Sequence, residues 1–284
     1  MILLDGYNVA KKRNLTLKEN IEKTTQRYKR SPQLSVILIG DNPASFSYVT
    51  GKGKACKLVG IDFKLHHLDK AVTQNEVEDL IQKLNQDQTV DGILLQLPIP
   101  KHLNESYLID LIDVEKDVDG FHVTNQGYLY QKKPCIVSAT PKGIINLLKT
   151  YDVNPSGMHA VIIGRSNIVG FPAARLLMDL GATITVCHSK TKDLAFHTKQ
   201  ADILVAAVGR PKLITKDMVK PGVIVIDVGV NRVDEKLVGD VDFEQLSEVA
   251  SMMTPVPKGV GPMTINALLE NTYEVYLNHQ QDLS

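Results

Sequence analysis

Cysteine, net charge and long apolar runs are all scarce in this chain. Its 284 residues include three cysteines, Cys56, Cys135 and Cys187, which are far apart and odd in number. None stands in a CxxC or Cys/His spacing typical of zinc sites. We therefore expect no metal centre, and the odd number and wide separation of the cysteines favour a reducing compartment.

The formal net charge is zero and the isoelectric point is about 7.1. A balance of this kind argues against a nucleic-acid-binding surface, which would carry an excess of basic residues. It stays compatible with a small anionic ligand, because local charge can be positive in a neutral protein. We therefore expect a small-molecule partner and no nucleic acid.

No apolar run approaches the ~20 residues that a membrane helix needs, so we expect no membrane partner. The first five residues, MILLD, are too short and too soon charged for a signal peptide. The composition, 43% hydrophobic and 23% charged, is ordinary for a globular protein, and the length suffices for two modest domains or one large one. The expected location is the cytoplasm.

Apolar runs of strand length alternate with helical patterns along the chain. This alternation predicts βαβ units, and therefore an α/β fold with mostly parallel sheets. Residues 111–133 are rich in Asp, Gly, Asn and Lys and are predicted to be loop. We expect Thr140 to cap a helix that has Pro141 at its first position. The predicted strands are 34–39, 61–68, 90–95, 159–163, 183–187, 203–207 and 223–228, and the predicted helices are 44–59, 76–84, 141–151 and 264–277.

Tyr48 and Lys52 are four residues apart, which on a helix places the phenol and the ammonium on one face. Such a pair can polarise, protonate or deprotonate a substrate. A YxxxK pair also occurs in short-chain dehydrogenases, but there it follows the nucleotide site, whereas here it precedes the glycine turn at Gly164. This order indicates one region for chemistry followed by one for a cofactor. Gly51 and Gly53 weaken the helix prediction, because each costs roughly 1 kcal/mol relative to alanine.

A nucleotide site is predicted at GRSNIVG, residues 164–170, between the strand 159–163 and a helical segment. Backbone N–H groups at such a turn can bind a diphosphate. Gly164 and Ser166 occupy the first two glycine positions of the usual GxGxxG pattern, so the pattern alone is weak. A tight βα turn without a ligand is the structural alternative.

The next predicted strand ends in CHSK, where NAD sites usually place an acid that accepts hydrogen bonds from the ribose. Ser189 and Lys190 stand there instead, and Arg165 follows the first glycine. These residues would accommodate a 2′-phosphate, which favours NADP over NAD. Ordinary solvated surface charge is the alternative for Arg165 and Lys190.

Three further motifs lie outside the nucleotide region. Gln96 ends an apolar strand, at the edge where ligands collect in open α/β sheets. The segment 116–122 carries Asp117 and Asp119, and Pro262 lies in a glycine turn that enters the last helix. Each also has a purely structural interpretation, as a strand end, turn formers or core.

Taken together, these motifs resemble the bifunctional methylenetetrahydrofolate dehydrogenase/methenyltetrahydrofolate cyclohydrolase family, in family order and over nearly the whole chain. Lys258 replaces a frequent glycine of that family, and Gly51 is unusual beside the lysine. The matching segments, besides Tyr48 and Lys52, are GDNPAS (40–45), DGILLQLP (91–98), KDVDGFH (116–122), TPKG (140–143), GRSNIVG (164–170), CHSKT (187–191), ADILV (201–205), VIDVG (225–229) and GVGPMT (259–264).

The resemblance implies a two-domain α/β enzyme of one-carbon folate metabolism, linked to purine biosynthesis. A catalytic, folate-binding domain would span 1–138 and be joined by the C-terminal helix 262–284. A Rossmann-type domain with a parallel sheet would span 139–261 and bind NADP. The family also implies a homodimer. The implied cofactor-binding residues are Gly164, Arg165, Ser166, Ser189 and Val230.

The implied chemistry is oxidation of methylenetetrahydrofolate by NADP, followed by hydrolysis of the methenyl cation to formyltetrahydrofolate. Lys52 would manage the proton transfers of hydrolysis, with Gln96 holding its amine. Tyr48 would stack on the ligand and orient Lys52, and Asp119 would accept hydrogen bonds from the pterin. Pro262 would complete the substrate-binding set.

Two other functions remain open from the residues alone. One is an NADP-dependent dehydrogenase of another small molecule, such as a shikimate or an amino acid, which leaves Gln96 and the loop 116–122 unexplained. The other is a nucleotide-sensing binding protein, which has no need of Tyr48, Lys52, Gln96 and Asp119 together.

The NADP assignment predicts that Arg165→Ala weakens NADP binding. A lost charge-assisted hydrogen bond is worth about 1.5–3 kcal/mol, so the affinity should fall roughly tenfold or more. Titration of wild type and variant with NADP measures this, and equal affinities would contradict the assignment.

Overall fold

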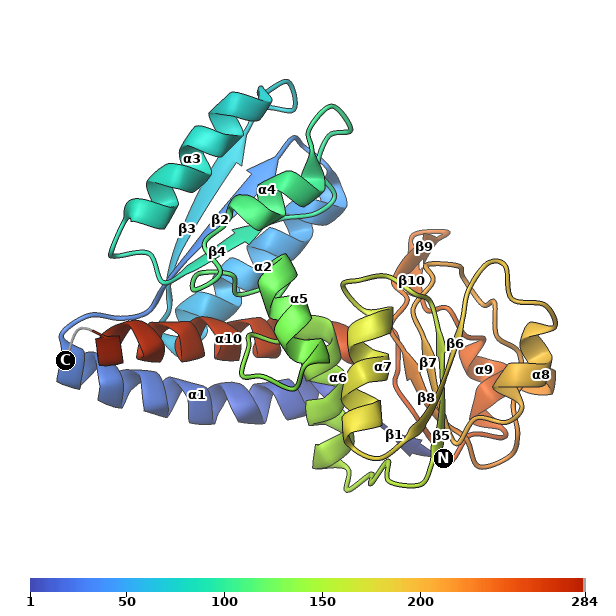
Figure 1. Cartoon of the computed structure of the whole chain (residues 1–284). Helices are drawn as coiled ribbons and strands as arrows, with labels where there is room; N and C mark the ends of the chain where they lie inside the picture. The colour runs from blue at the N-terminus through green and yellow to red at the C-terminus, as the bar shows by residue number, and fades with distance from the viewer. Residues whose placement is uncertain (283–284) are drawn as a thin grey trace. The chain divides into compact units, whose positions relative to one another are not determined.

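The computed structural model describes residues 1–282 and divides them into two compact units (Figure 1). The six-stranded unit comprises residues 1–11 and 140–264, and the three-stranded unit comprises residues 12–139 and the chain from Ile265 onward. Both units combine helices with parallel sheets, so the predicted α/β class is confirmed.

The predicted boundaries differ from this division at the N-terminus, because residues 1–11 belong to the six-stranded unit. The reason is strand pairing: β1 (Ile2–Leu3) pairs with β11 (Met252–Met253) at the end of that sheet. The last helix, α10 (Val260–Asp282), begins earlier than predicted, and residues 283–284 of the predicted C-terminal segment lie outside the described residues.

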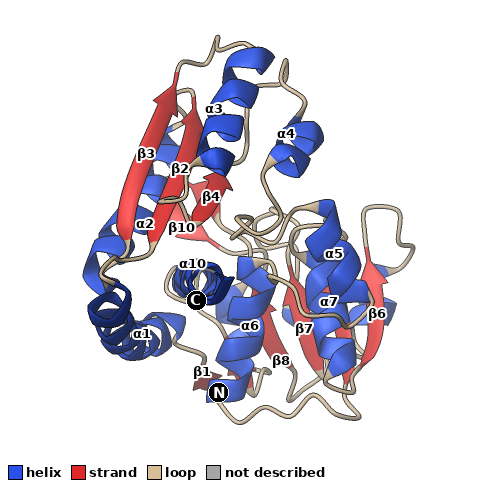
Figure 2. Cartoon of the chain, turned by 60° about the vertical axis from the view of Figure 1, so that its left-hand side comes forward, coloured by secondary structure: helices blue, strands red, loops and turns tan. Residues whose placement is uncertain are grey.

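The three-stranded sheet is parallel and has the order β3-β2-β4. Side chains alternate across its central strand. Val36 and Leu38 pack in the core that includes α2, whereas Ile37 and Ile39 pack in the core that includes α3. The helices therefore cover opposite faces (Figure 2). The elements are β2 (Gln33–Ile39), α2 (Pro43–Val59), β3 (Asp62–Leu68), α3 (Gln74–Gln86) and β4 (Gly92–Leu95).

Helix α2 runs without interruption through Gly51 and Gly53. The side chain of Asn42 accepts hydrogen bonds from two backbone N–H groups of its first turn, and Gly60 ends the helix in a left-handed conformation. A Cβ on Gly53 would lie 3.1 Å from the ring of Phe63. Gly53 thus permits close packing of α2 on β3, which offsets its low helix propensity.

The prediction of loop over 111–133 is wrong, because α5 (Val123–Tyr130) lies within it, after α4 (Glu105–Leu111). The sequence VTNQGYLY has weak helix formers and a glycine, so its propensity is low. Side-chain contacts supply the missing stability. The ring Nδ1 of His122 accepts a hydrogen bond from Thr124 N, and the Asn125 side chain donates to Asp117.

Helix α1 (Gly6–Tyr28) was not predicted, because its sequence is mostly polar. Within the three-stranded unit it lies beside α10, where Arg13 forms a two-pronged ion pair with Glu270. Its few apolar residues, such as Leu17 and Ile21, are buried in the same core as the apolar residues of α10.

The six-stranded sheet is also parallel throughout and has the order β1-β11-β8-β7-β5-β6. The nucleotide region therefore begins with β5. The next strand, β6, is added on one side of β5, and β7 and β8 are added on the other side. Four strands agree closely with prediction: β5 (His159–Ile163), β6 (Thr183–Cys187), β7 (Ile203–Ala206) and β8 (Ile224–Asp227).

Helix α6 begins at Ala139, so Thr140 lies inside the helix and does not cap it as predicted. Its hydroxyl oxygen lies 3.0 Å from that of Thr264. The remaining elements are α7 (Gly170–Asp179), α8 (Leu194–Thr198), the short 3-10 helix Lys216–Met218, β9 (Asn231–Val233), β10 (Lys236–Val238) and α9 (Phe243–Ser247).

No helix within residues 1–282 combines the length and the hydropathy that crossing a membrane requires.

Gly51→Ala should raise the free energy of unfolding by about 1 kcal/mol, because alanine is the better helix former. The only atom near the added Cβ is Ile265 Cδ1, at 3.9 Å, so there is room for it. Denaturant unfolding measures the change.

Gly53→Ala is the matched control, since it gains the same propensity on the same helix. Its Cβ meets the Phe63 ring, so its gain should be smaller or reversed. A Gly51→Ala protein no more stable than wild type would contradict this account of α2.

Candidate functional site

Lys52 and Gln96 are brought together at the carboxyl end of the three-stranded sheet. The Lys52 ammonium donates to Gln96 Oε1 at 3.0 Å. The other end of the amide is also fixed, because Gln96 Nε2 donates to the carbonyl of Leu97 at 2.7 Å. The amide therefore has one orientation, with its oxygen toward the amine.

Lys52 is buried, with 7% of its surface exposed, on the inner face of α2. Burial lowers the pKa of its amine, because removal from water disfavours the charged form. The negative charge of Asp119 acts in the opposite direction. Among the predicted catalytic residues, Lys52 is thus the one whose surroundings make it easier to deprotonate.

Asp119 is half-buried, and burial raises the pKa of its carboxyl group to about 6. The charge of Lys52 lowers that pKa and the charge of Asp117 raises it. At neutral pH Asp119 is therefore largely ionised, and it can accept hydrogen bonds from N–H groups.

Tyr48 lies one helical turn before Lys52 on α2, as predicted, with 40% of its surface exposed. Burial of its hydroxyl raises the pKa of the phenol. The phenol is consequently neutral at physiological pH. It can donate a hydrogen bond or offer its ring face, but it is not a base.

The carboxylate of Asp117 shapes the loop that carries Asp119. It accepts hydrogen bonds from Gly120 N, His122 N and Asn125 Nδ2, at 3.0, 2.9 and 2.9 Å. Gly120 adopts a positive φ of 67°, and a Cβ there would lie 2.6 Å from Ser138 N. The loop that carries Asp119 is therefore closed tightly around one buried acid.

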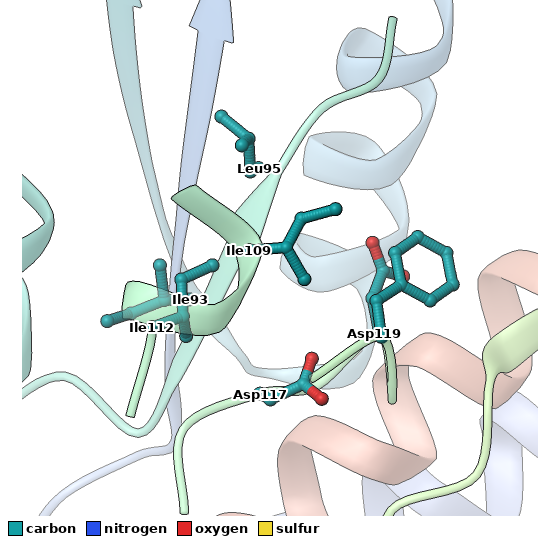
Figure 3. A pocket seen from close by; sticks show the side chains of 7 residues that line it. Ile93, Leu95, Ile109, Ile112, Asp117 and Asp119 are labelled. Carbon is teal, nitrogen blue, oxygen red and sulfur yellow. The ribbon is translucent and has the colours of Figure 1, made fainter. Parts of the chain in front are cut away.

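Asp117 and Asp119 also line a small pocket that is open to solvent. Figure 3 shows both acids on the same side of the pocket, with the apolar side chains of β4 and α4 beside them. The other lining residues are Ile93, Leu95, Ile109, Ile112 and Phe121. Apolar walls with a few polar groups are typical of small-molecule sites.

Lys116, also in this motif, has a structural role. Its ammonium donates to the carbonyls of Leu84, Asn85 and Asp87, at 3.0, 2.7 and 2.8 Å. It thereby binds the carbonyl end of α3, where a cation is favoured. The sequence alone did not distinguish the structural roles of Lys116 and Asp117 from that of Asp119. The three acceptors of Lys116 lie about 30 residues earlier in the chain, and the three donors to Asp117 depend on the shape of the turn.

In the six-stranded unit, the predicted nucleotide turn lies at the point where the strand order reverses, after β5. Gly164 has a φ of 120°, and a Cβ on it would lie 2.2 Å from the carbonyl oxygen of Ala207, which follows β7. A Cβ on Gly170 would lie 2.2 Å from the carbonyl oxygen of Gly164. Both glycines are thus required by close backbone contacts, at the crevice where α/β sheets bind ligands.

Ser166 follows in the same turn, where its hydroxyl accepts hydrogen bonds from Val169 N and Gly170 N at 3.2 and 3.3 Å. These N–H groups stand at the beginning of α7. Arg165 and Ser166 themselves are exposed. The turn therefore presents polar groups to solvent beside the N-terminus of a ten-residue helix, a suitable place for phosphate.

The turn after β6 presents Ser189 and Lys190 to solvent at the same edge of the sheet. Gly164 N donates to the carbonyl of Cys187, which connects the two strand ends. The turn is fixed by His188 N donating to Thr191 Oγ1 at 2.8 Å. The predicted residues Ser189 and Lys190 are therefore exposed beside the glycine turn; their contact with the cofactor stays a prediction.

Val230 follows β8 and is 46% exposed, so it too lies beyond the carboxyl end of a strand. Pro262 lies in the first turn of α10, in the six-stranded unit, whereas Tyr48, Lys52, Gln96 and Asp119 belong to the three-stranded unit. Near Pro262, Lys258 has a φ of 82°, a left-handed conformation that explains why glycine is common there in the family.

Within residues 1–282, no three His, Cys, Asp or Glu side chains gather as metal ligands would.

Comparisons with known proteins cover both units. Residues 4–119 match the catalytic-domain model of tetrahydrofolate dehydrogenase/cyclohydrolase, and residues 138–280 match the NAD(P)-binding-domain model of the same family. Bifunctional protein FolD of Acholeplasma laidlawii is 56% identical over 281 residues, which are 99% of this chain and 100% of that protein.

Solved structures agree with this result. The bifunctional FolD methylenetetrahydrofolate dehydrogenase/cyclohydrolase of Campylobacter jejuni is 49% identical, with a TM-score of 0.96 and coverage of 98% of this chain and 99% of that one. The Trypanosoma brucei enzyme, solved with NADP and an inhibitor, is 36% identical, with a TM-score of 0.95 and 98% of both chains covered. The chain belongs to the tetrahydrofolate dehydrogenase/cyclohydrolase family.

Proposed function

We propose that this protein oxidises methylenetetrahydrofolate with NADP and then hydrolyses the methenyl product to formyltetrahydrofolate. Membership of the family over nearly the full length carries this conclusion. The lysine held by an amide in one unit and the glycine turn in the other supply groups suited to the two reactions.

Hydride transfer needs little from the protein beyond orientation. The carbon that loses hydride lies between two nitrogens, whose lone pairs stabilise the resulting cation, so no general base is required. NADP, when bound, accepts the hydride. The residues proposed to hold it are Gly164, Arg165, Ser166, Ser189 and Val230, which follow β5, β6 and β8 in one sheet.

Hydrolysis does require proton transfer, because water loses a proton as it adds and a ring nitrogen gains one as the ring opens. We assign this work to Lys52, whose burial lowers the pKa of the amine and so increases its neutral fraction. Gln96 accepts a hydrogen bond from the amine without adding charge. A cationic substrate would lower that pKa further.

Folate binding is assigned to Tyr48, Gln96, Asp119 and Pro262. Asp119 would accept hydrogen bonds from the N–H edge of the pterin, and its ionised form at neutral pH suits that role. Tyr48 would stack on the ring system with its exposed face. The three-stranded unit would accordingly bind folate and the six-stranded unit NADP.

The protein is further proposed to act in the cytoplasm as a homodimer that supplies one-carbon units to purine biosynthesis. One feature supports self-association: β3 pairs only with β2 in its sheet, and Leu65 on it is 40% exposed. An edge strand with exposed apolar residues is a candidate interface.

A spectroscopic assay tests the proposed function directly. Production of NADPH from methylenetetrahydrofolate reports the first reaction, and decay of methenyltetrahydrofolate absorbance reports the second. Absence of both reactions in the purified protein would refute the proposal.

Lys52→Met should separate the activities. Loss of a general acid–base group costs typically 10²–10⁴-fold, so hydrolysis should fall at least ~100-fold while some hydride transfer remains. Lys54→Met, an exposed change on the same helix, is the matched control and should leave both rates intact. Normal cyclohydrolase turnover in Lys52→Met would refute the role of this lysine.

Gln96→Glu should move the pH profile of hydrolysis to higher pH. A carboxylate in place of an amide oxygen 3.0 Å from the amine stabilises the ammonium, and an opposite charge at this range shifts a pKa by roughly 1–3 units. The rate at pH 7 should therefore fall about tenfold or more and recover in part as the pH rises.

The matched control is Gln82→Glu, which adds the same charge at an exposed position of α3. The profiles are compared by cyclohydrolase rates across pH. A reduced rate with no change in the pH dependence would contradict electrostatic control of Lys52.

A further inference from the structure

The carboxylate of Asp240 connects two loops at the carboxyl edge of the six-stranded sheet. It accepts hydrogen bonds from three consecutive backbone N–H groups after β7, those of Val208, Gly209 and Arg210, at 2.6, 3.0 and 2.8 Å. It also accepts one from Asn231 Nδ2, after β8, at 2.9 Å. Asp240 is fully buried, so one side chain defines the separation of these loops.

Asp240 is itself held by a second buried acid. Its backbone N–H donates to Asp227 Oδ1 at 2.8 Å, and Gly229 N donates to the same oxygen at 3.1 Å. Two glycines leave room for these carboxylates. A Cβ on Gly229 would lie 2.2 Å from Asp240 Oδ1, and a Cβ on Gly239 would overlap Asp227 Oδ2.

The loop held by Asp240 begins at the nucleotide turn. Ala207, the residue before Val208, donates its N–H to the carbonyl of Ile163, the last residue of β5. Its own carbonyl oxygen occupies the space that a Cβ on Gly164 would need. On the other side, Asn231 directly follows Val230, one of the residues proposed to contact the cofactor.

We propose that Asp240 is a positioning residue for cofactor binding, acting through the backbone of 208–210 and through Asn231. This inference rests on the proposed use of NADP at this edge. The carboxylate fixes the loop after β7 against the glycine turn and, through Asn231, fixes the exposed Val230. It does not touch the cofactor, and the three-stranded unit, which carries Lys52, does not depend on it.

Asp240→Asn tests the proposal. The amide keeps the shape but presents an NH₂ group to donors that need an acceptor, so at least one of the four bonds is lost. The KM for NADP should rise roughly tenfold, the size expected for losing one bond to a buried charged acceptor, with kcat changed by less than about twofold. Hydrolysis of methenyltetrahydrofolate, assayed without NADP, should be unchanged.

Asp242→Asn is the matched control. It alters a carboxylate two residues away that caps α9 and does not bond the loop 208–210. It should leave the KM for NADP unaltered. Asn231→Ala is a milder second variant, which removes the bond to Asp240 on the Val230 side, together with a longer one of 3.5 Å to the carbonyl of Val238, and should raise the KM for NADP by a smaller factor.

The outcomes separate this proposal from the proposed function. A wild-type protein without NADP-dependent activity would refute the function itself. With wild-type activity present, an unchanged KM for NADP in Asp240→Asn would overturn the positioning role. So would parallel loss of both activities with a lowered melting temperature. If Asp240→Asn fails to fold, the KM for NADP in Asn231→Ala decides.

Discussion

The site of the three-stranded unit depends on one constraint: the amine of Lys52 is buried beside a neutral acceptor, the amide oxygen of Gln96. A carboxylate in place of Gln96 would accept a stronger hydrogen bond from Lys52, but its charge would keep the lysine protonated. The neutral amide accepts the hydrogen bond and leaves the pKa of Lys52 low. The remaining geometry follows from this requirement. Gln96 must end a buried strand, Lys52 must lie on the inner face of α2, and the acid nearby must be held at a separate position on its own loop.

The six-stranded unit stabilises its buried charges in a different way. Asp227 and Asp240 are both buried, and backbone N–H groups donate to their carboxylates. Burial raises the pKa of Asp227 to about 6 despite these bonds. Such acids order loops through bonds from backbone N–H groups. Buried acids thus fix the loops at this edge, while Arg165 and Lys190 near them stay exposed.

The sequence allowed correct prediction of elements whose own residues determine them. β5 and β6 agree to the residue, because short segments of β-branched and apolar residues ended by Gly164 or by the polar His188 leave little choice. Elements stabilised by distant partners were missed. Helix α1 is mostly polar and depends on contacts with α10, and α5 depends on Asp117.

The residues of the candidate site also differ in whether local sequence or distant partners determine their roles. The spacing of Tyr48 and Lys52, and Gln96 at a strand end, were visible as local patterns, and the structure joins Lys52 to Gln96. Asp240 was not foreseen, because its importance comes from backbone groups 30 to 32 positions earlier in the chain. No local pattern distinguishes such an acid from a turn former.

The division of the chain into two units determines whether either unit could be produced as a separate fragment. The chain passes from one unit to the other at 11/12, 139/140 and 264/265, and these points fall inside α1, α6 and α10. No single cut releases a complete module. A fragment ending at 139 would lack Leu268 and Val275, which belong to its core. Exchange of one unit between two such proteins would therefore require three junctions at once, each inside a helix.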